Sequence, residues 1–161
     1  MYSDAEGSQH YPSGFGLLYP SKGNFIGFIG NLSSRSLVRE AVAAFRETTP
    51  FPSEGSAVPA AIPGVGWSDH WSFWQEGYAA IMVTDTAPFR NPHYHQPTDK
   101  PDTLDYDRMT RVTRGLVNVV LRIASQANAA TFKCDIGSKP HTVQNRNPWS
   151  QQINLKKLDT F

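Results

Sequence analysis

The loop at residues 90–106 concentrates side chains that can bind a metal ion; it reads RNPHYHQPTDKPDTLDY. Its prolines and threonines disfavour a helix. His93 and His95 are separated by one residue, so in extended backbone both imidazoles point to one face and could bind one ion. Alternatively, one histidine binds and the other supports it, because a ligating histidine usually donates its second ring N–H to a carboxylate. Asp99 and Asp102 are close enough in sequence to supply that carboxylate.

A zinc site and an ordinary structural loop both fit this segment. Zinc accepts His and carboxylate ligands, and a catalytic zinc takes three protein ligands plus water. However, two histidines around one residue, followed by aspartates, form a weak motif, since Asp and Thr side chains also stabilise turns by bonding to the backbone. The spacing alone therefore favours the structural alternative and leaves metal binding open.

A second polar group, Ser68-Asp69-His70, stands at the expected start of a short helix. Backbone N–H groups at a helix start attract anions or polarise a carbonyl, so this group could contact a substrate. The simpler interpretation is that Asp69 caps the helix and His70 packs in the interior. The aromatic side chains beside the group are expected to form core and pocket wall; they are Trp67, Trp71, Phe73 and Trp74.

Hydrophobic patterns predict two strands that position these groups. Residues 24–31 form a short apolar run between turn residues, and residues 78–86 form a second run that ends in polar residues. Residues 50–66, rich in Pro, Ala and Gly, are interpreted as a loop. Sites in open α/β sheets lie at the carboxyl ends of strands, so the loop after residue 86 is well placed for function. Two strands are few for a sheet.

Three helices are predicted, the first and third from apolar residues that recur every three or four positions, and the second from a cap at Ser68 and a stop at Gly77. The first covers residues 33–48, begins at Ser33 or Ser34, and ends before Pro50. The second is short, at residues 68–77. The third begins near Asp105; its apolar positions are Met109, Val112, Leu116, Val119, Val120 and Ile123. The order strand, helix, helix, strand, helix predicts an α/β fold.

Composition restricts the classes of function. The chain has 161 residues, which fits one domain. The 15 Lys and Arg residues nearly balance the 14 Asp and Glu residues, which argues against nucleic acid as the main partner. No apolar run approaches the ~20 residues of a membrane span, and no signal peptide is recognisable. Cys134 is the only cysteine, so an internal disulfide and a Cys-cluster zinc site are excluded.

Several motifs occur in a consistent order: SDH followed by F and G, a strand ending in TDTA, then RNPHYH and DTLDY, with SQHYP and YPSKGNFIGFIGN upstream. Together they resemble the M28 peptidases, zinc aminopeptidases of the bacterial leucyl type, over residues 2–125. The resemblance implies that residues 1–126 are the C-terminal portion of a three-layer α/β/α peptidase domain. Residues 127–161 do not share it and are expected to be an irregular, poorly ordered tail.

The resemblance also implies roles for individual residues. Members of the family bind two zinc ions, which are bridged by an aspartate and a water, and the last ligand in the chain corresponds to His95. Asp69 is similar to the residue that supports the substrate side of the site, with His70 beside it. His93, Tyr94 and Asp99 would line the same loop. The family's H-x-D and paired-Glu segments are missing from this sequence, so no residue is assigned as catalytic.

The expected function is therefore a fragment of a zinc aminopeptidase that is inactive alone, because a single histidine cannot hold a zinc ion. Its substrate would be the N-terminus of a peptide or protein. One alternative is a non-catalytic binding or assembly module that associates through an exposed sheet edge. Another is a transferase on the same scaffold, similar to the glutaminyl cyclases.

Overall fold

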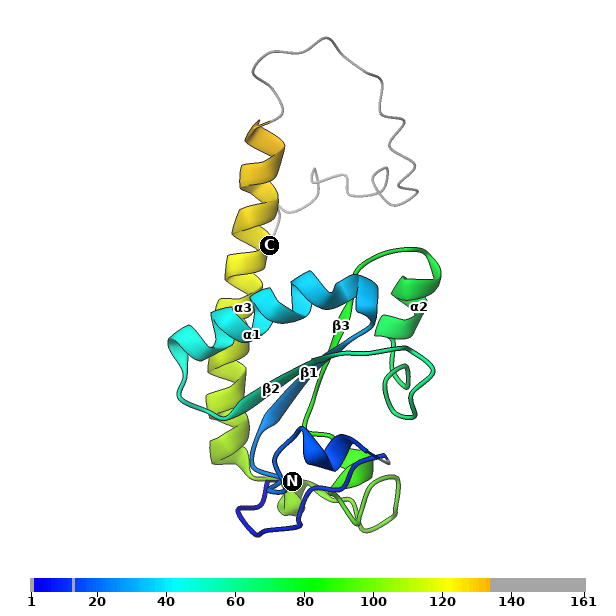
Figure 1. Ribbon diagram of the computed structural model, residues 1–161. Helices are drawn as coiled ribbons and strands as arrows, with labels where there is room; N and C mark the ends of the chain where they lie inside the picture. Colours follow the sequence, from blue (N-terminus) through cyan, green and yellow to red (C-terminus); the bar gives the residue numbers. More distant parts are fainter. Residues whose placement is uncertain (1, 13, 134–161) are drawn as a thin grey trace, which may run out of the picture.

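A mixed sheet with three strands organises the computed structural model, which describes residues 2–12 and 14–133 (Figure 1). The strands are β1 (Ile26–Gly30), β2 (Ser53–Ala57) and β3 (Ile81–Thr84), in the order β2-β1-β3. The central strand β1 pairs parallel with β2 and antiparallel with β3. The α/β prediction is confirmed, and the predicted strands at 24–31 and 78–86 correspond to β1 and β3.

The helix α1 (Arg35–Thr48) covers one face of the sheet at close range. Phe28 of β1 is fully buried and packs edge-to-face on Phe45 of α1, with ring centroids 5.4 Å apart. Gly30 and Gly55 face the same helix, and a Cβ atom on either would lie within 2.9 Å of a valine methyl group of α1. Glycine is therefore required at these two positions of the sheet, because α1 leaves no room there for a Cβ atom.

The start of α1 differs from the prediction, although its end at Thr48 is as expected. A short 3-10 helix, Leu32–Ser34, precedes α1, and the side chain of Asn31 accepts a hydrogen bond from the Ser34 amide at 2.8 Å. Ser34 makes no side-chain cap. Its hydroxyl instead accepts from the amide of Ala80, at 3.2 Å, and so ties the helix start to the chain entering β3.

The strand β2 lies inside the segment that was interpreted as a loop, so that interpretation is wrong. Its sequence, SEGSA, lacks the β-branched and aromatic residues that mark a strand. Pairing with β1 and the approach of α1 impose the extended backbone and the small residues. Phe51 is buried just before the strand, and the Nε of Arg46 donates to the hydroxyl of Ser53 at 3.0 Å.

The long helix α3 (Tyr106–Lys133) crosses α1 and completes the core (Figure 1). Asp105 caps its start, because the carboxylate accepts a hydrogen bond from the Arg108 amide at 2.9 Å. Val112 and Val119 are buried in the cluster around Phe28 and Phe45. The helix continues into residues 127–133, which were expected to be irregular; residues 134–161 of that expected tail lie outside the described residues.

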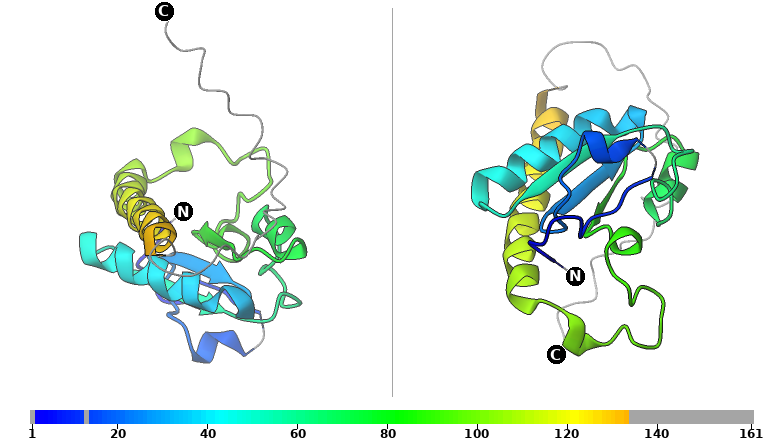
Figure 2. Two further views of the ribbon diagram at one scale, coloured as in Figure 1. Left: turned by 90° about the horizontal axis from the view of Figure 1, so that it is seen from above. Right: turned by 60° about the horizontal axis from the view of Figure 1, so that its bottom comes forward.

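Within the described part of the chain, the long helices α1 and α3 lie on the same side of the sheet. The opposite face is covered by the N-terminal segment, which includes the 3-10 helix Phe15–Leu17, and by the loops after β2 and β3. The short helix α2 (His70–Gln75) stands beside β3, away from α3, in two directions of view (Figures 1 and 2). No helix within the described residues is long and apolar enough to cross a membrane.

The contact between α1 and α3 gives a direct test of the packing. A Cβ atom on Gly115 would lie 2.5 Å from Cε2 of Phe45 and 2.7 Å from Cγ2 of Thr49. We expect Gly115→Ala to lower the free energy of unfolding by up to about 2 kcal/mol, because overpacking costs about 1–3 kcal/mol and the gain in helix propensity offsets about 1 kcal/mol. Urea denaturation measures it. Thr113→Ala, exposed on the same helix, should change stability by less than about 0.5 kcal/mol, and a stabilised Gly115→Ala would contradict the packing.

Candidate functional site

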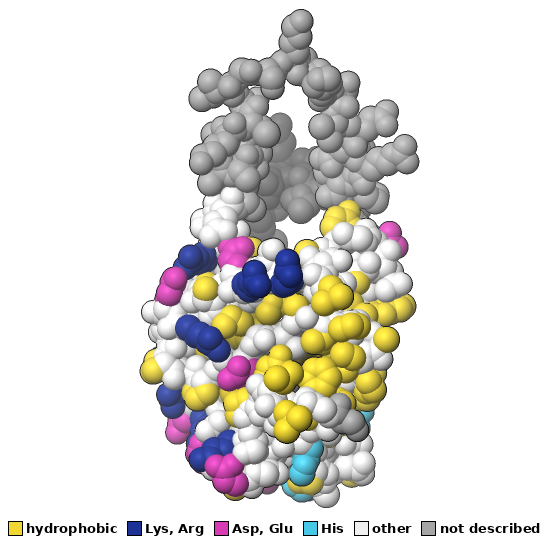
Figure 3. Space-filling model, viewed as in Figure 1, with side chains coloured by type: hydrophobic (Ala, Val, Ile, Leu, Met, Phe, Trp, Pro, Cys, Tyr) yellow, Lys and Arg dark blue, Asp and Glu magenta, His cyan; other side chains and the backbone are white. Residues whose placement is uncertain are grey.

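An apolar cavity of about 310 Å³ lies on the face of the sheet opposite α1. Its floor is formed by side chains of the three strands, and the N-terminal segment and two loops form its walls. Hydrophobic side chains also gather on the surface over α2 and the loop before it, whereas basic side chains gather over α1 (Figure 3). The apolar residues that line the cavity include Tyr11, Phe15, Phe25, Ile29, Val58, Ile62, Val65, Trp67, Met82, Phe89 and Tyr94.

The loop with His93 and His95 is folded into turns beside this cavity. The amide of Gln96 donates to the carbonyl of His93 at 2.8 Å, and His95 has a positive φ of 57°. The backbone at these residues is therefore not extended, so the condition under which both imidazoles would point to one face is not met. The ring of His95 stacks on Tyr94, with centroids 3.9 Å apart, and is exposed to solvent.

The carboxylate expected to support a histidine does not do so. Nδ1 of His93 lies 2.9 Å from the hydroxyl of Thr98, and the backbone amide of His93 donates to the side chain of Asn91 at 3.0 Å. Asp99 is exposed, and its amide bonds to the carbonyl of Gln96 at 2.9 Å. These contacts are those of an ordinary turn, as the structural alternative predicted.

His70, in the first turn of α2, is packed in the interior. Its side chain is only 6% exposed and stands edge-to-face to Trp74 at 4.5 Å. Nε2 lies 2.6 Å from the carbonyl oxygen of Val65. Because a carbonyl only accepts, Nε2 carries a proton and donates; in a neutral ring Nδ1 is then an acceptor. Nδ1 is buried and has no hydrogen-bond partner in the described part of the chain.

Asp69 does not cap α2, so that expectation is wrong. Its side chain is exposed and makes no capping hydrogen bond; backbone carbonyls of Ser68 and Asp69 accept the bonds of the first turn. The neighbouring aromatic residues were expected to form core and pocket wall, and Trp67 lines the apolar cavity while Phe73 lines a second hollow. Trp74 is partly buried and donates to the carbonyl of Ala80 at 3.0 Å, whereas Trp67, Trp71 and Phe73 are exposed.

The two polar groups meet at the apolar cavity. Ser68 and Tyr94 both line it, so the SDH group and the histidine loop face a common space. A second hollow of about 340 Å³ adjoins Ser68, Asp69 and His70 and extends along β3. Nevertheless, the described residues contain no group of three or more His, Cys, Asp or Glu side chains that could hold a metal ion.

A scan against protein families matches the chain to "Peptidase family M28" over residues 20–120. The chain belongs to peptidase family M28. This M28 chain is 38% identical over 120 residues to the uncharacterized protein YfbL of Escherichia coli, an alignment that covers 74% of the chain and 37% of YfbL.

The M28 chain is also similar to a probable leucine aminopeptidase of Arthroderma otae, with 39% identity over 67 residues, or 40% of the chain and 18% of that protein. The chain thus spans little more than a third of the length of the first relative and less of the second. No solved structure gives a significant match to the chain. The closer assignment to the bacterial leucyl type stays a prediction.

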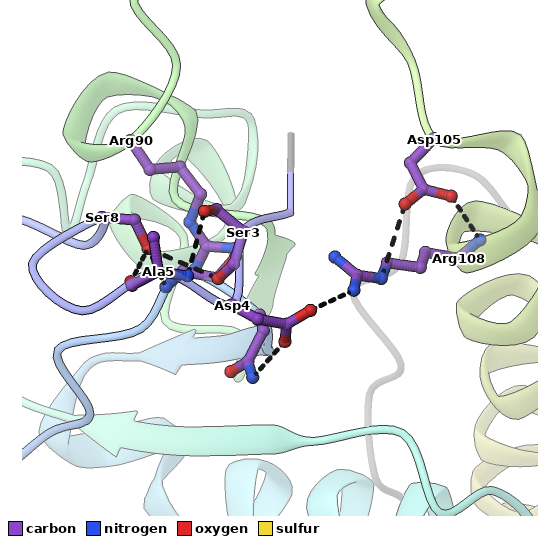
Figure 4. Close-up of polar contacts among 9 residues, drawn as sticks. Ser3, Asp4, Ala5, Ser8, Arg90, Asp105 and Arg108 are labelled. Atoms are coloured by element: carbon purple, nitrogen blue, oxygen red, sulfur yellow. Dashed lines mark hydrogen bonds and ion pairs between the residues drawn. The ribbon is translucent and has the colours of Figure 1, made fainter.

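The M28 chain also contains a partly buried arginine, Arg90, to which the sequence assigned no role of its own. Nε of Arg90 donates to the side-chain oxygen of Gln9 at 2.8 Å, and Nη1 donates to the carbonyls of Gly23 and Phe25 at 2.9 and 3.0 Å. Figure 4 shows Arg90 beside the N-terminal segment. Burial lowers the pKa of Arg90, while the nearby carboxylate of Asp85 opposes that shift.

Arg90 joins the histidine loop to a segment more than sixty residues earlier in the chain. The hydroxyl of Thr86 donates to the same oxygen of Gln9 at 2.7 Å, and the amide of His10 donates to the carbonyl of Phe89 at 3.0 Å. The N-terminal segment then carries Tyr11 and other residues to the cavity wall. Sequence shows Arg90 within RNPHYH but gives no sign of its distant partners.

A second polar link holds the N-terminal segment to α3. The guanidinium of Arg108 donates to the carboxylate of Asp4 at 2.6 Å and lies 3.4 Å from that of Asp105 (Figure 4). Asn24 donates to the other oxygen of Asp4 at 2.8 Å. Hydrogen bonds from Asn24 and Arg108 lower the pKa of Asp4. Because Asp4 is exposed, solvent screens this contribution to stability.

The residues present do not fit a complete zinc site. A catalytic zinc takes three protein ligands, and the family resemblance supplies His95 alone in this chain. His93 is engaged by Thr98, Asp99 turns away into solvent, and Nε2 of His70 is engaged by Val65. The structure accordingly offers a binding cavity beside one available imidazole, and no reaction step through a metal follows from these residues alone.

The role of Arg90 can be tested with a lysine substitution. Arg90→Lys keeps the charge but loses the fork that reaches Gln9, Gly23 and Phe25, and we expect the free energy of unfolding to fall by about 2 kcal/mol or more. Amide hydrogen exchange within residues 2–25 should accelerate, as followed by mass spectrometry. Arg111→Lys is the control, because Arg111 is exposed and lies over the ring of Phe51 at 5.4 Å. Equal effects of the two substitutions would contradict the assigned role.

Proposed function

We propose that this M28 chain is part of the catalytic domain of a zinc-dependent aminopeptidase, to which it contributes the pocket for a substrate side chain and one zinc ligand, His95. The observation that carries the proposal is the apolar cavity whose wall includes Tyr94, the residue on which His95 stacks. A side chain bound there would hold the adjoining peptide bond near the exposed imidazole of His95.

The cavity suits an apolar side chain. Its lining is dominated by aromatic and aliphatic groups, and polar groups such as Glu54, Ser56 and Thr86 are few. Burial of a leucine-sized side chain is worth about 1.5–3 kcal/mol. A binding site with an apolar interior and few polar groups at its border is typical of small-molecule pockets. We therefore expect a preference for substrates with a large apolar N-terminal residue.

In this proposal, the chain by itself binds and orients the substrate but does not hydrolyse the peptide bond. Peptide hydrolysis in the family needs a water activated by metal and a base that moves its proton. The described residues offer one imidazole for the first task, and we assign none to the second. Leucine p-nitroanilide should accordingly be hydrolysed by the purified chain no faster than in buffer alone.

The second proposal is a non-catalytic binding or assembly module. A chain with His95 as its single candidate zinc ligand is also what such a module would have. The two proposals differ in the use of the cavity. A fragment of an aminopeptidase keeps a pocket that binds an amino-acid side chain, whereas a module that only assembles has no need of one. Nothing in the site favours the glutaminyl-cyclase-like alternative.

Binding of leucine amide to the chain tests the proposed pocket. We expect amide chemical shifts of residues around the cavity to change, with a Kd on the order of 1 mM for so small a ligand. Tyr94→Ala should weaken binding about fivefold or more, because an aromatic contact worth about 1 kcal/mol is lost.

Tyr106→Ala is the matched control, because Tyr106 is exposed on α3 and does not line the cavity. Unchanged affinity is expected for this variant. The pocket assignment would be refuted by an absence of shifts at the cavity, or by equal weakening in both variants.

A further inference from the structure

One row of residues crosses the floor of the apolar cavity from strand to strand. Gly27 of β1 pairs with Glu54 of β2 on one side and with Thr84 of β3 on the other, and all three residues line the cavity. Neighbouring strands lie about 4.8 Å apart, so the backbone of Glu54 lies roughly 10 Å from that of Thr84. The cavity therefore extends across the described sheet, from β3 to Glu54 on β2 (Figure 1).

Gly27 leaves room for a ligand in the middle of this row. A Cβ atom there would lie 3.3 Å from the carbonyl oxygen of Thr84 and 3.6 Å from Cδ1 of Ile29. Because glycine carries no side chain, the floor at this point is backbone, whereas a larger residue would project into the cavity between β3 and Glu54. A ligand side chain that enters beside β3 can thus lie across β1 and reach the carboxylate of Glu54.

Glu54 supplies the only carboxylate among the described residues that line the cavity, and no Lys, Arg or His lines it. The guanidinium of Arg46 stands 4.0 Å away, too far for a hydrogen bond. Arg46 is held instead by Ser53, because Nε donates to its hydroxyl at 3.0 Å and Nη2 donates to its carbonyl. In the part of the chain that the structure describes, the Glu54 carboxylate accepts no hydrogen bond, and its side chain is 34% exposed. The carboxylate is therefore available to a ligand that donates.

A cluster of aromatic rings forms part of the cavity wall. The ring centroids of Tyr11 and Tyr19 lie 6.0 Å apart, and those of Phe15 and Tyr19 lie 6.3 Å apart. Burial raises the pKa of Tyr11 to about 12, and the negative charge of Glu54 adds to that rise, so this charge acts on the aromatic wall. Aromatic faces attract cations, as carboxylates do. The wall and Glu54 together favour a positively charged group at this end of the cavity.

We infer that the pocket selects an N-terminal lysine or arginine, with the apolar stem of that side chain over Gly27 and its cation against the carboxylate of Glu54. The inference rests on the proposed function, because it takes the cavity as the pocket for the N-terminal side chain and refines the apolar preference. The aliphatic stem of lysine or arginine packs on apolar surface while its charged end keeps polar surroundings. The partly exposed position of Glu54 suits such an end.

A side chain without a charged end would leave Glu54 unused. A short apolar side chain that enters beside Tyr94 contacts the apolar lining and ends before β2. A longer one would press methyl groups against the carboxylate and displace its water, which is unfavourable. A hydrogen bond between a cation and a carboxylate is, by contrast, among the stronger kinds. We therefore expect lysine and arginine to bind more tightly than apolar residues of similar length.

Two amino-acid amides of similar length test the inference. Lysine amide and norleucine amide share a linear stem and the α-amino group, and only lysine amide carries a terminal ammonium. Both would be titrated into the chain while the amide chemical shifts around the cavity are followed. We expect lysine amide to bind about tenfold more tightly or better, the ratio that a charge-assisted hydrogen bond provides.

Two substitutions that remove one negative charge supply the comparison. Glu54→Gln keeps the size of the side chain, and it should weaken lysine amide about tenfold while norleucine amide changes by less than about twofold. Retained binding of norleucine amide shows that the pocket of this variant is folded. Glu76→Gln is the matched control, because Glu76 is exposed at the end of α2 and does not line the cavity. Both affinities should stay as they are in this control.

Equal affinities of the two amides for the unmodified chain would overturn the inference and leave the proposed pocket in place. Equal weakening of both amides by Glu54→Gln would also overturn it, since the carboxylate would then bind the α-amino group that they share. An absence of shifts at the cavity with every amide would refute the pocket and the inference together. Binding of lysine amide without binding of leucine amide would support the role of Glu54 and refute the apolar preference.

Discussion

The buried guanidinium of Arg90 is the constraint on which the candidate site depends. Three of its hydrogen bonds fix the chain between Gln9 and Phe25 against the loop that follows β3. One wall of the apolar cavity comes from the first of these segments, and Tyr94 comes from the second. Since the two segments are far apart in sequence, the cavity depends on this polar link together with the bonds from Thr86 to Gln9 and from His10 to Phe89.

The parts of the fold with a strong hydrophobic period could be predicted from the sequence. β1, α1 and the start of α3 follow directly from apolar spacing, and the order of SDH, TDTA and RNPHYH indicated family M28 before any geometry was known. β2 could not be recognised, because the approach of α1 selects small residues there and removes the usual marks of a strand. The small residues of β2 are explained by its packing against α1, and that packing is known only from the three-dimensional structure.

The site was harder to predict because the same side chains serve as ligands and as turn residues. His93 and Asp99 had metal-binding chemistry by type, yet a threonine hydroxyl engages His93 and Asp99 faces solvent. Asp69 was expected as a cap and makes none. Arg90 was given no role from the sequence, yet its hydrogen-bond partners lie at residues 9, 23 and 25. A close set of ionisable residues in sequence is therefore a poor guide to which of them share a site.

The central claim is that this M28 chain holds a substrate pocket and one zinc ligand without a complete zinc site. Zinc per chain, measured by elemental analysis after dialysis against a weak chelator, tests it most directly. The account predicts a value well below one zinc per chain, with no difference among the unmodified chain, His95→Ala and the control His10→Ala, at an exposed histidine. One or two zinc ions per chain that are lost in His95→Ala and retained in His10→Ala would contradict it.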